Sequence, residues 1–112
     1  MDTYEIRHYV DESGNDLYQD WIMGLRDQVA KVAVYRRVAR IAVGNFGDHK
    51  FLQDGVWELR IDVGQGYRVY YAQVESKVIL LILGGDKRTQ DADIAKASKL
   101  LRNWEKRNET RS

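Results

Sequence analysis

The sequence predicts one small α+β domain over residues 1–112, with its elements in the order β-α-α-β-β-β-α. Apolar and polar residues alternate over 57–63 and 67–73, on either side of Gly64-Gln65-Gly66, which is typical of a β-hairpin. The continuous apolar run Val78–Leu83 suits a further strand covered on both faces. Apolar residues at helical spacing precede the hairpin and follow the last strand. We expect an antiparallel sheet with two N-terminal helices packed on one face. The C-terminal helix would lie on the other face or at the sheet edge.

The first part of the chain is predicted to hold one strand and two helices. Tyr4–Val10 contains β-forming residues and ends in a segment of turn and N-cap residues: Asp11, Ser13, Gly14 and Asn15. The first helix is indicated by an apolar stripe of Leu17, Trp21 and Leu25. A second helix is expected from about Gln28 to Val43, because Gly44 is a natural residue to follow a helix C-terminus.

The second part is predicted to be mostly sheet. A loop, Asn45–Gly55, leads into the strand Trp57–Val63. The residues expected to face the core are Trp57, Leu59, Ile61, Tyr67, Val69 and Tyr71. After the turn at 75–77, Gly84-Gly85 is expected to end the last strand, and a helix is expected from Asp91 to about Trp104.

Composition excludes several classes of protein. The chain has no Cys, and its two histidines, His8 and His49, are too far apart for a metal-ligand spacing, so we expect no disulfide, metal or cofactor. No apolar run approaches the roughly 18 residues of a membrane span, and the acidic start is unlike a signal peptide. We therefore expect a soluble, cytoplasmic protein.

Charge is distributed unevenly along a chain whose net charge is only +1. Residues 1–30 carry seven acidic and two basic residues, whereas 31–112 carry ten acidic and sixteen basic ones. A basic part of this kind can meet nucleic acid, although solvated surface charge is an equally good reading of the charge alone.

Two arginines stand on the predicted polar face of the hairpin. Glu58, Arg60, Arg68 and Tyr70 would project from it, and cross-strand neighbours lie roughly 5 Å apart, so both guanidinium groups could converge on one phosphate. Lys87 and Arg88 follow the last strand, and Lys50 precedes the hairpin, so these cations could add to the same site. Fixed cations of this kind could stabilise the pentavalent phosphate formed when an RNA 2′-hydroxyl attacks.

Simpler explanations stay open at each of these positions. Either arginine could form only surface ion pairs with its acidic neighbours, and Tyr67 and Tyr71 are better read as core residues than as stacking platforms. Tyr70 could stack on an RNA base, because its predicted face is polar. His49, near Lys50, could carry a proton, although a plain surface role is the simpler reading.

Several segments, in order and spacing, resemble the RelE/ParE toxin superfamily, and in particular its HigB-like addiction module killer proteins. The matching segments are R-V-A-R-I-A-V-G-N-F-G-D-H-K (37–50), G-V-W-E-L-R-I-D (55–62), G-Y-R-V-Y-Y (66–71), G-G-D-K-R-T-Q (84–90) and D-I-A-K-A (93–97). The resemblance covers nearly the whole chain and implies the RelE fold, with two helices packed on an antiparallel sheet.

The resemblance also implies a function. Toxins of this type II toxin-antitoxin group arrest growth as metal-independent endoribonucleases (mRNA interferases) that cut mRNA in the ribosomal A site, and a small helix-turn-helix antitoxin restrains them. By position, Arg60, Arg68 and Lys87 match the basic residues of the catalytic site. Substrate contacts are expected from Lys50, Tyr70, Arg88 and Glu58.

One departure from the family pattern leaves an alternative open. Some relatives carry a Tyr or His that helps proton transfer after the position of Lys87, and this chain has only Asp93 in that region. The general acid and base are therefore unassigned. A ParE-like inhibitor of DNA gyrase that cuts no RNA is the alternative function.

Overall fold

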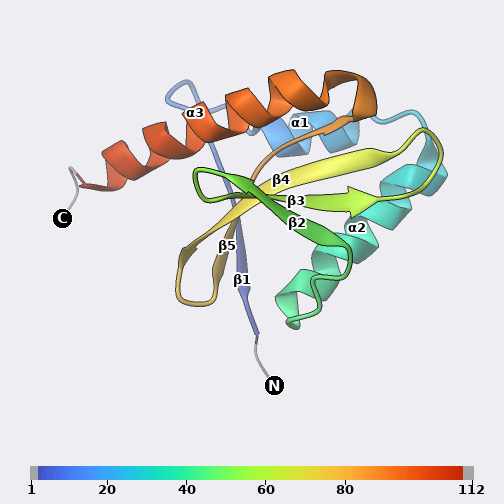
Figure 1. Cartoon of the computed structure of the whole chain (residues 1–112), viewed down its shortest axis with the longest axis horizontal. Helices are drawn as coiled ribbons and strands as arrows, with labels where there is room; N and C mark the ends of the chain where they lie inside the picture. The colour runs from blue at the N-terminus through green and yellow to red at the C-terminus, as the bar shows by residue number, and fades with distance from the viewer. Residues whose placement is uncertain (1–2, 110–112) are drawn as a thin grey trace.

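The computed structural model describes residues 3–109 and contains one five-stranded sheet with three α-helices (Figure 1). The elements in chain order are β1 (Glu5–His8), α1 (Leu17–Met23), α2 (Gln28–Ala42), β2 (His49–Gln53), β3 (Val56–Ile61), β4 (Tyr67–Glu75), β5 (Val78–Asp86), the short 3₁₀ helix η1 (Lys87–Thr89) and α3 (Gln90–Glu109). The strand order is β1-β5-β4-β3-β2. β1 runs parallel to β5, and every other pair is antiparallel. The predicted α+β class is confirmed, but the sheet is mixed rather than purely antiparallel, because β1 joins β5 in parallel.

The two N-terminal helices cover one face of the sheet. Each begins at an aspartate whose carboxylate accepts a backbone N–H of the first turn: Asp16 from Gln19 and Asp27 from Ala30. Their buried residues pack against every second residue of the hairpin strands, as the alternation predicted. This core includes Tyr18, Ile22, Val34, Ile41, Leu59, Ile61, Tyr67, Val69, Tyr71 and Leu81.

The C-terminal helix α3 covers part of the other face and extends along the sheet (Figure 1). It buries Ala97 and Leu101 against a second set of strand residues: Val56, Tyr70, Ala72, Leu80 and Ile82. Both faces of β4 and β5 are therefore covered, which explains the continuous apolar run of β5. On the face that the sequence predicted to be polar, α3 leaves side chains accessible where β3 ends and β4 begins and along β2.

Several boundaries shift by a few residues from the sequence predictions, α3 among them, which runs on to Glu109, and two differences bear on the site. The segment expected to be a loop contains the edge strand β2, whose residues are mostly exposed. The last strand does not end at Gly84-Gly85 but continues through both glycines to Asp86. A Cβ on Gly84 would lie only 2.1 Å from the Trp21 ring, so close packing of α1 on the strand requires this glycine.

None of the helices that the structure describes has the length and apolar character needed to cross a membrane.

Candidate functional site

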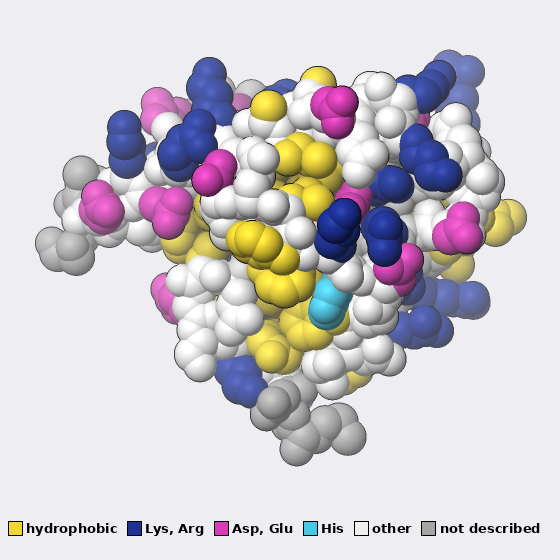
Figure 2. All heavy atoms as spheres, viewed as in Figure 1, with side chains coloured by type: hydrophobic (Ala, Val, Ile, Leu, Met, Phe, Trp, Pro, Cys, Tyr) yellow, Lys and Arg dark blue, Asp and Glu magenta, His cyan; other side chains and the backbone are white. Residues whose placement is uncertain are grey.

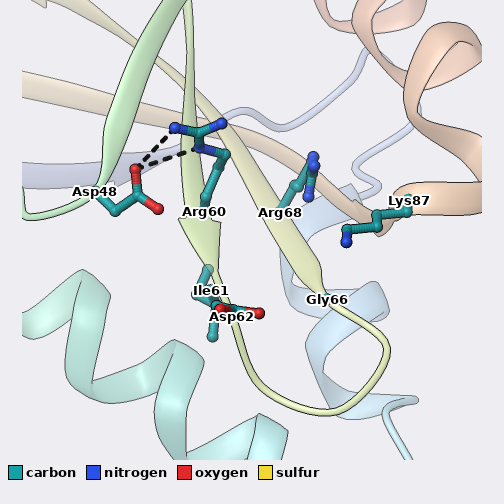
Figure 3. A pocket seen from close by; sticks show the side chains of 7 residues that line it. All are labelled: Asp48, Arg60, Ile61, Asp62, Gly66, Arg68 and Lys87. Atoms are coloured by element: carbon teal, nitrogen blue, oxygen red, sulfur yellow. Dashed lines mark hydrogen bonds and ion pairs between the residues drawn. The ribbon is translucent and has the colours of Figure 1, made fainter.

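A hollow of about 320 Å³ opens where β3 ends and β4 begins, and three basic side chains border it (Figure 3). Arg60 on β3 and Arg68 on β4 are direct cross-strand partners, so they emerge side by side from the same sheet face. Lys87 follows β5, the next strand in the sheet, and lines the same hollow. The structure thus brings together the three residues that were expected to be catalytic. We call this the cationic hollow; Asp48, Ile61, Asp62 and Gly66 complete its lining.

Arg60 is the more accessible arginine of the pair. Its side chain is 41% exposed, and its Nη2 lies 3.0 Å from the carboxylate of Asp48 (Figure 3). Asp48 is also exposed, so this ion pair is worth at most about 1 kcal/mol and a phosphate can compete with it. Asp48 could not be assigned to the site from the sequence, because the edge strand that follows it and places it beside Arg60 was not predicted.

Arg68 is held differently. Its side chain is only 11% exposed, and its Nε is ion-paired with the carboxylate of Glu58, whose side chain is 2% exposed. Gln90, the first residue of α3, donates a hydrogen bond of 2.9 Å to the same carboxylate. Glu58 therefore holds the guanidinium group of Arg68 in place on the buried side, and Arg68 also lines the cationic hollow. The prediction that Glu58 is an exposed substrate contact is wrong, since the N-terminus of α3 covers it.

Lys87 reaches the hollow across the hairpin turn. Gly66 adopts a φ of +86°, and a Cβ there would lie 3.1 Å from Cε of Lys87. A glycine at this position both permits the turn and lets the lysine side chain lie over it. Lys87 itself is exposed, so its ammonium group is accessible to a bound anion.

The other predicted substrate contacts lie outside the hollow. Lys50 is exposed on β2 in register with Glu58, which places it on the same sheet face farther from the strand ends. Arg88 is exposed and pairs with Asp86, which keeps the pKa of Asp86 below its usual range. The prediction that Tyr70 stacks on a base is wrong, because α3 buries its ring completely.

Arg37 on α2 organises the rim of the hollow, a role that was not predicted from the sequence. Arg37 donates hydrogen bonds to the backbone carbonyls of Phe46, Asp48 and Arg60. It thereby joins α2, the segment before β2 and the end of β3. Burial lowers the pKa of Arg37, but an arginine remains charged. The period of the helix gave no signal for this role, because the carbonyl groups that Arg37 binds come from a segment with no predicted structure.

Two further polar groups lie near the N-terminus of α3: Asp93 in its first turn and Tyr70 on the strand that it covers. Burial raises the pKa of Asp93, and the Thr89 hydroxyl donates a hydrogen bond of 2.6 Å to it. Burial also raises the pKa of Tyr70, and among the described residues its hydroxyl has no hydrogen-bond partner. Tyr70 therefore stays neutral at physiological pH. Neither Asp93 nor Tyr70 lines the cationic hollow.

His49, considered above as a proton carrier, lies away from the cationic hollow. His49 is in register with Leu59, so its ring lies on the opposite face of the sheet from Arg60 and contacts Phe46 and Trp57. It lines a separate hollow and none of the cationic one. The remaining geometry is that of an anion site: two arginines on the adjacent strands β3 and β4, and a lysine directly after β5, border one hollow.

Comparison with known proteins finds one matching family and a similar bacterial protein. Residues 20–105 match the family described as Phage derived protein Gp49-like (DUF891). The chain is also similar to an uncharacterized protein of Haemophilus influenzae (strain ATCC 51907 / DSM 11121 / KW20 / Rd). The two are 48% identical over 84 residues, covering 75% of this chain and 84% of that protein.

Proposed function

Because this chain belongs to the phage-derived Gp49-like family, whose members are often toxins of toxin-antitoxin systems, we propose that it is a toxin that cleaves mRNA on the ribosome. The observation that carries the proposal is the convergence of Arg60, Arg68 and Lys87 on one hollow at the end of the sheet. The resemblance to HigB-like toxins supports the same activity and assigns the same three residues to its site.

The reaction begins with the RNA 2′-hydroxyl attacking the adjacent phosphorus. A bond forms from the 2′-oxygen to phosphorus as the 2′-hydroxyl gives its proton to a base. The bond to the 5′-oxygen breaks as that oxygen takes up a proton from solvent, so the products carry a 2′,3′-cyclic phosphate and a 5′-hydroxyl. The non-bridging oxygens gain charge in the pentavalent state. Arginine groups held on strands stabilise that charge without having to reorganise, and a lysine that follows the next strand adds to it.

The three cations would divide this work according to their surroundings. Arg68 is fixed by Glu58 and buried on one side, so it gives a preorganised contact to the phosphate. Arg60 exchanges the carboxylate of Asp48 for a phosphate oxygen, and Lys87 approaches from the other side as a mobile point charge. Asp48 and Asp62 are the carboxylates that line the hollow, and they are our candidates for accepting the 2′-hydroxyl proton.

Two macromolecular partners follow from this proposal. The ribosome would present the mRNA, and a cognate helix-turn-helix antitoxin would restrain the toxin. An acidic antitoxin segment could cover the cationic hollow, or the antitoxin could bind elsewhere and exclude the toxin from the ribosome.

The test is to map mRNA 5′ ends after brief induction of the wild-type chain and of Arg60→Ala. Arg60 is chosen because its exposed pair with Asp48 makes the substitution mild for folding. New ends inside translated codons, absent in the variant, are expected. Growth arrest with a DNA-damage response and no new ends would instead identify the gyrase inhibitor of the alternative reading.

A further inference from the structure

A second hollow, of about 180 Å³, lies on the opposite face of the sheet and is lined mainly by aromatic rings. Tyr4, Phe46, His49, Trp57 and Tyr71 contribute to it, and we call it the aromatic hollow. Residues of β2, β3, β4 and β5 line it, and no residue of a described helix does. No step of the proposed reaction uses these residues.

The rings form a connected edge-to-face series. The Phe46 and His49 centroids are 5.4 Å apart, and the His49 and Trp57 centroids are 5.2 Å apart. Phe51, the next residue on this face of β2, continues the series at 5.3 Å from Trp57 and is 49% exposed. T-shaped packing leaves ring faces and edges unshared, so a further planar ring can stack against them.

The aromatic and cationic hollows meet at a single segment. Asp48 lines the cationic hollow, and its neighbour His49 lines the aromatic one. Arg37 fixes this segment through the carbonyls of Phe46 and Asp48, so the two hollows keep a constant relation. Figure 2 shows, on one face of the molecule, a hydrophobic patch and a histidine beside a group of Lys and Arg side chains.

We propose that the aromatic hollow binds a nucleobase of the RNA strand whose phosphate occupies the cationic hollow. This inference rests on the proposed function and adds a base-binding subsite to it. A single strand crossing the β2 edge would place a phosphate beside Arg60 and a neighbouring base against Trp57 and Phe51. His49 and Gln73 supply polar groups at the lining that can reach base edges.

An RNA strand fits this pair of surfaces better than an apolar protein segment does. An aromatic platform beside a cationic groove is the arrangement by which proteins hold single-stranded nucleic acid, since every base has a stacking face and every linkage a charge. A protein segment that filled only the aromatic hollow would have no use for the cations at its border. An antitoxin side chain is therefore an outcome for the experiment to exclude.

The experiment measures binding of a short 2′-O-methyl RNA, which cannot be cleaved, to wild type, Phe51→Ala and Tyr35→Ala. A matched oligonucleotide lacks one base but keeps every phosphate. Phe51 is exposed, so its truncation leaves the core intact, and Tyr35 is a matched control because it is 45% exposed and lies on α2. Fluorescence anisotropy at fixed salt gives the dissociation constants.

We expect Phe51→Ala to weaken binding of the complete RNA by about 5- to 100-fold, the range found when one base-stacking ring is removed, and Tyr35→Ala to leave it unchanged. The abasic RNA should bind wild type and Phe51→Ala alike. The subsite would be overturned if removal of the base weakened binding to wild type and to Phe51→Ala by the same factor. It would also be overturned if wild type bound the complete and the abasic RNA equally well. Loss of antitoxin binding with unchanged RNA binding in Phe51→Ala would assign the hollow to the antitoxin and also overturn it.

A second readout separates this inference from the proposed function. In mapped mRNA ends, Phe51→Ala should still cut, with a weaker base preference beside the cut. Cuts with unchanged rate and preference would refute the subsite and leave the nuclease standing. Absence of cuts by the wild type would refute the nuclease itself.

Discussion

The substitution Arg68→Ala should lower the free energy of unfolding far more than Arg60→Ala does, although both arginines line the same hollow. The reason is the partner that each leaves behind. Arg68→Ala leaves the carboxylate of Glu58, 2% exposed, without its counter-charge, whereas Arg60→Ala leaves Asp48, which is 54% exposed and keeps its contact with water. The hydrogen bond from Gln90 remains in Arg68→Ala but carries no charge.

The expected magnitudes differ by several kcal/mol. Breaking a buried ion pair by removing one partner costs about 3–5 kcal/mol, and an exposed pair contributes about 0–1 kcal/mol. A domain of this size is stable by about 5–15 kcal/mol, so Arg68→Ala removes a large part of the total. With a urea m-value of about 1.5 kcal/mol/M, the unfolding midpoint should fall by about 2–3 M for Arg68→Ala and by less than about 0.7 M for Arg60→Ala.

Urea unfolding followed by circular dichroism measures both midpoints, and a rescue variant identifies the cause. Glu58→Gln combined with Arg68→Ala removes the unpaired charge and should recover at least about half of the lost stability, because a buried neutral amide costs less than a buried charge. Equal midpoints for the two single variants, or no recovery in the double variant, would refute the reasoning. If it holds, loss of toxicity in Arg68→Ala reflects folding as well as function, and functional tests belong on Arg60 and Lys87.

Three further predictions concern packing, charge and pH. Gly84→Ala should destabilise the fold by about 1–3 kcal/mol or more in urea unfolding, because its Cβ would overlap the Trp21 ring; wild-type stability would contradict the packing described. Asp48→Asn should tighten binding of a non-cleavable RNA by up to about fivefold, because Arg60 loses its competing carboxylate, and weaker binding would show that Asp48 assists instead. Burial raises the pKa of Asp93 above 3.8, so its contribution to stability is present below about pH 4 and is lost as the pH rises through its folded-state pKa. The change in unfolding free energy from pH 4 to pH 7 should therefore be more positive in Asp93→Asn, and an identical change in both proteins would exclude Asp93 as the source.

The hairpin and its core face were predictable because period-2 alternation is a local signal. Leu59, Ile61, Val69 and Tyr71 lie in the core as predicted, and the register places Arg60 opposite Arg68. Once the two strands pair, the relation between these arginines follows from geometry alone.

The covering of the other face was not predictable from the strands. Alternation marks Glu58 and Tyr70 as members of one face but does not say whether a helix covers that face. The path of α3 decides this, and it buries both residues. Edge strand β2 was missed for a related reason: His49–Gln53 is mostly exposed and shows no alternation, and its structure comes from pairing with β3. Asp48 and the aromatic hollow were missed with it.

The most direct test of the central claim is a cleavage reaction with purified protein and ribosomes programmed with a defined mRNA. We expect wild-type protein to produce fragments with a 5′-hydroxyl and a 2′,3′-cyclic phosphate, the products of 2′-hydroxyl attack. Arg60→Ala and Lys87→Ala change accessible side chains of the cationic hollow. Once circular dichroism has shown that each variant is folded, each should reduce the single-turnover rate by about 10-fold or more, the scale of losing one transition-state contact. An intact mRNA with wild-type protein, or undiminished cleavage by both variants, would contradict the account.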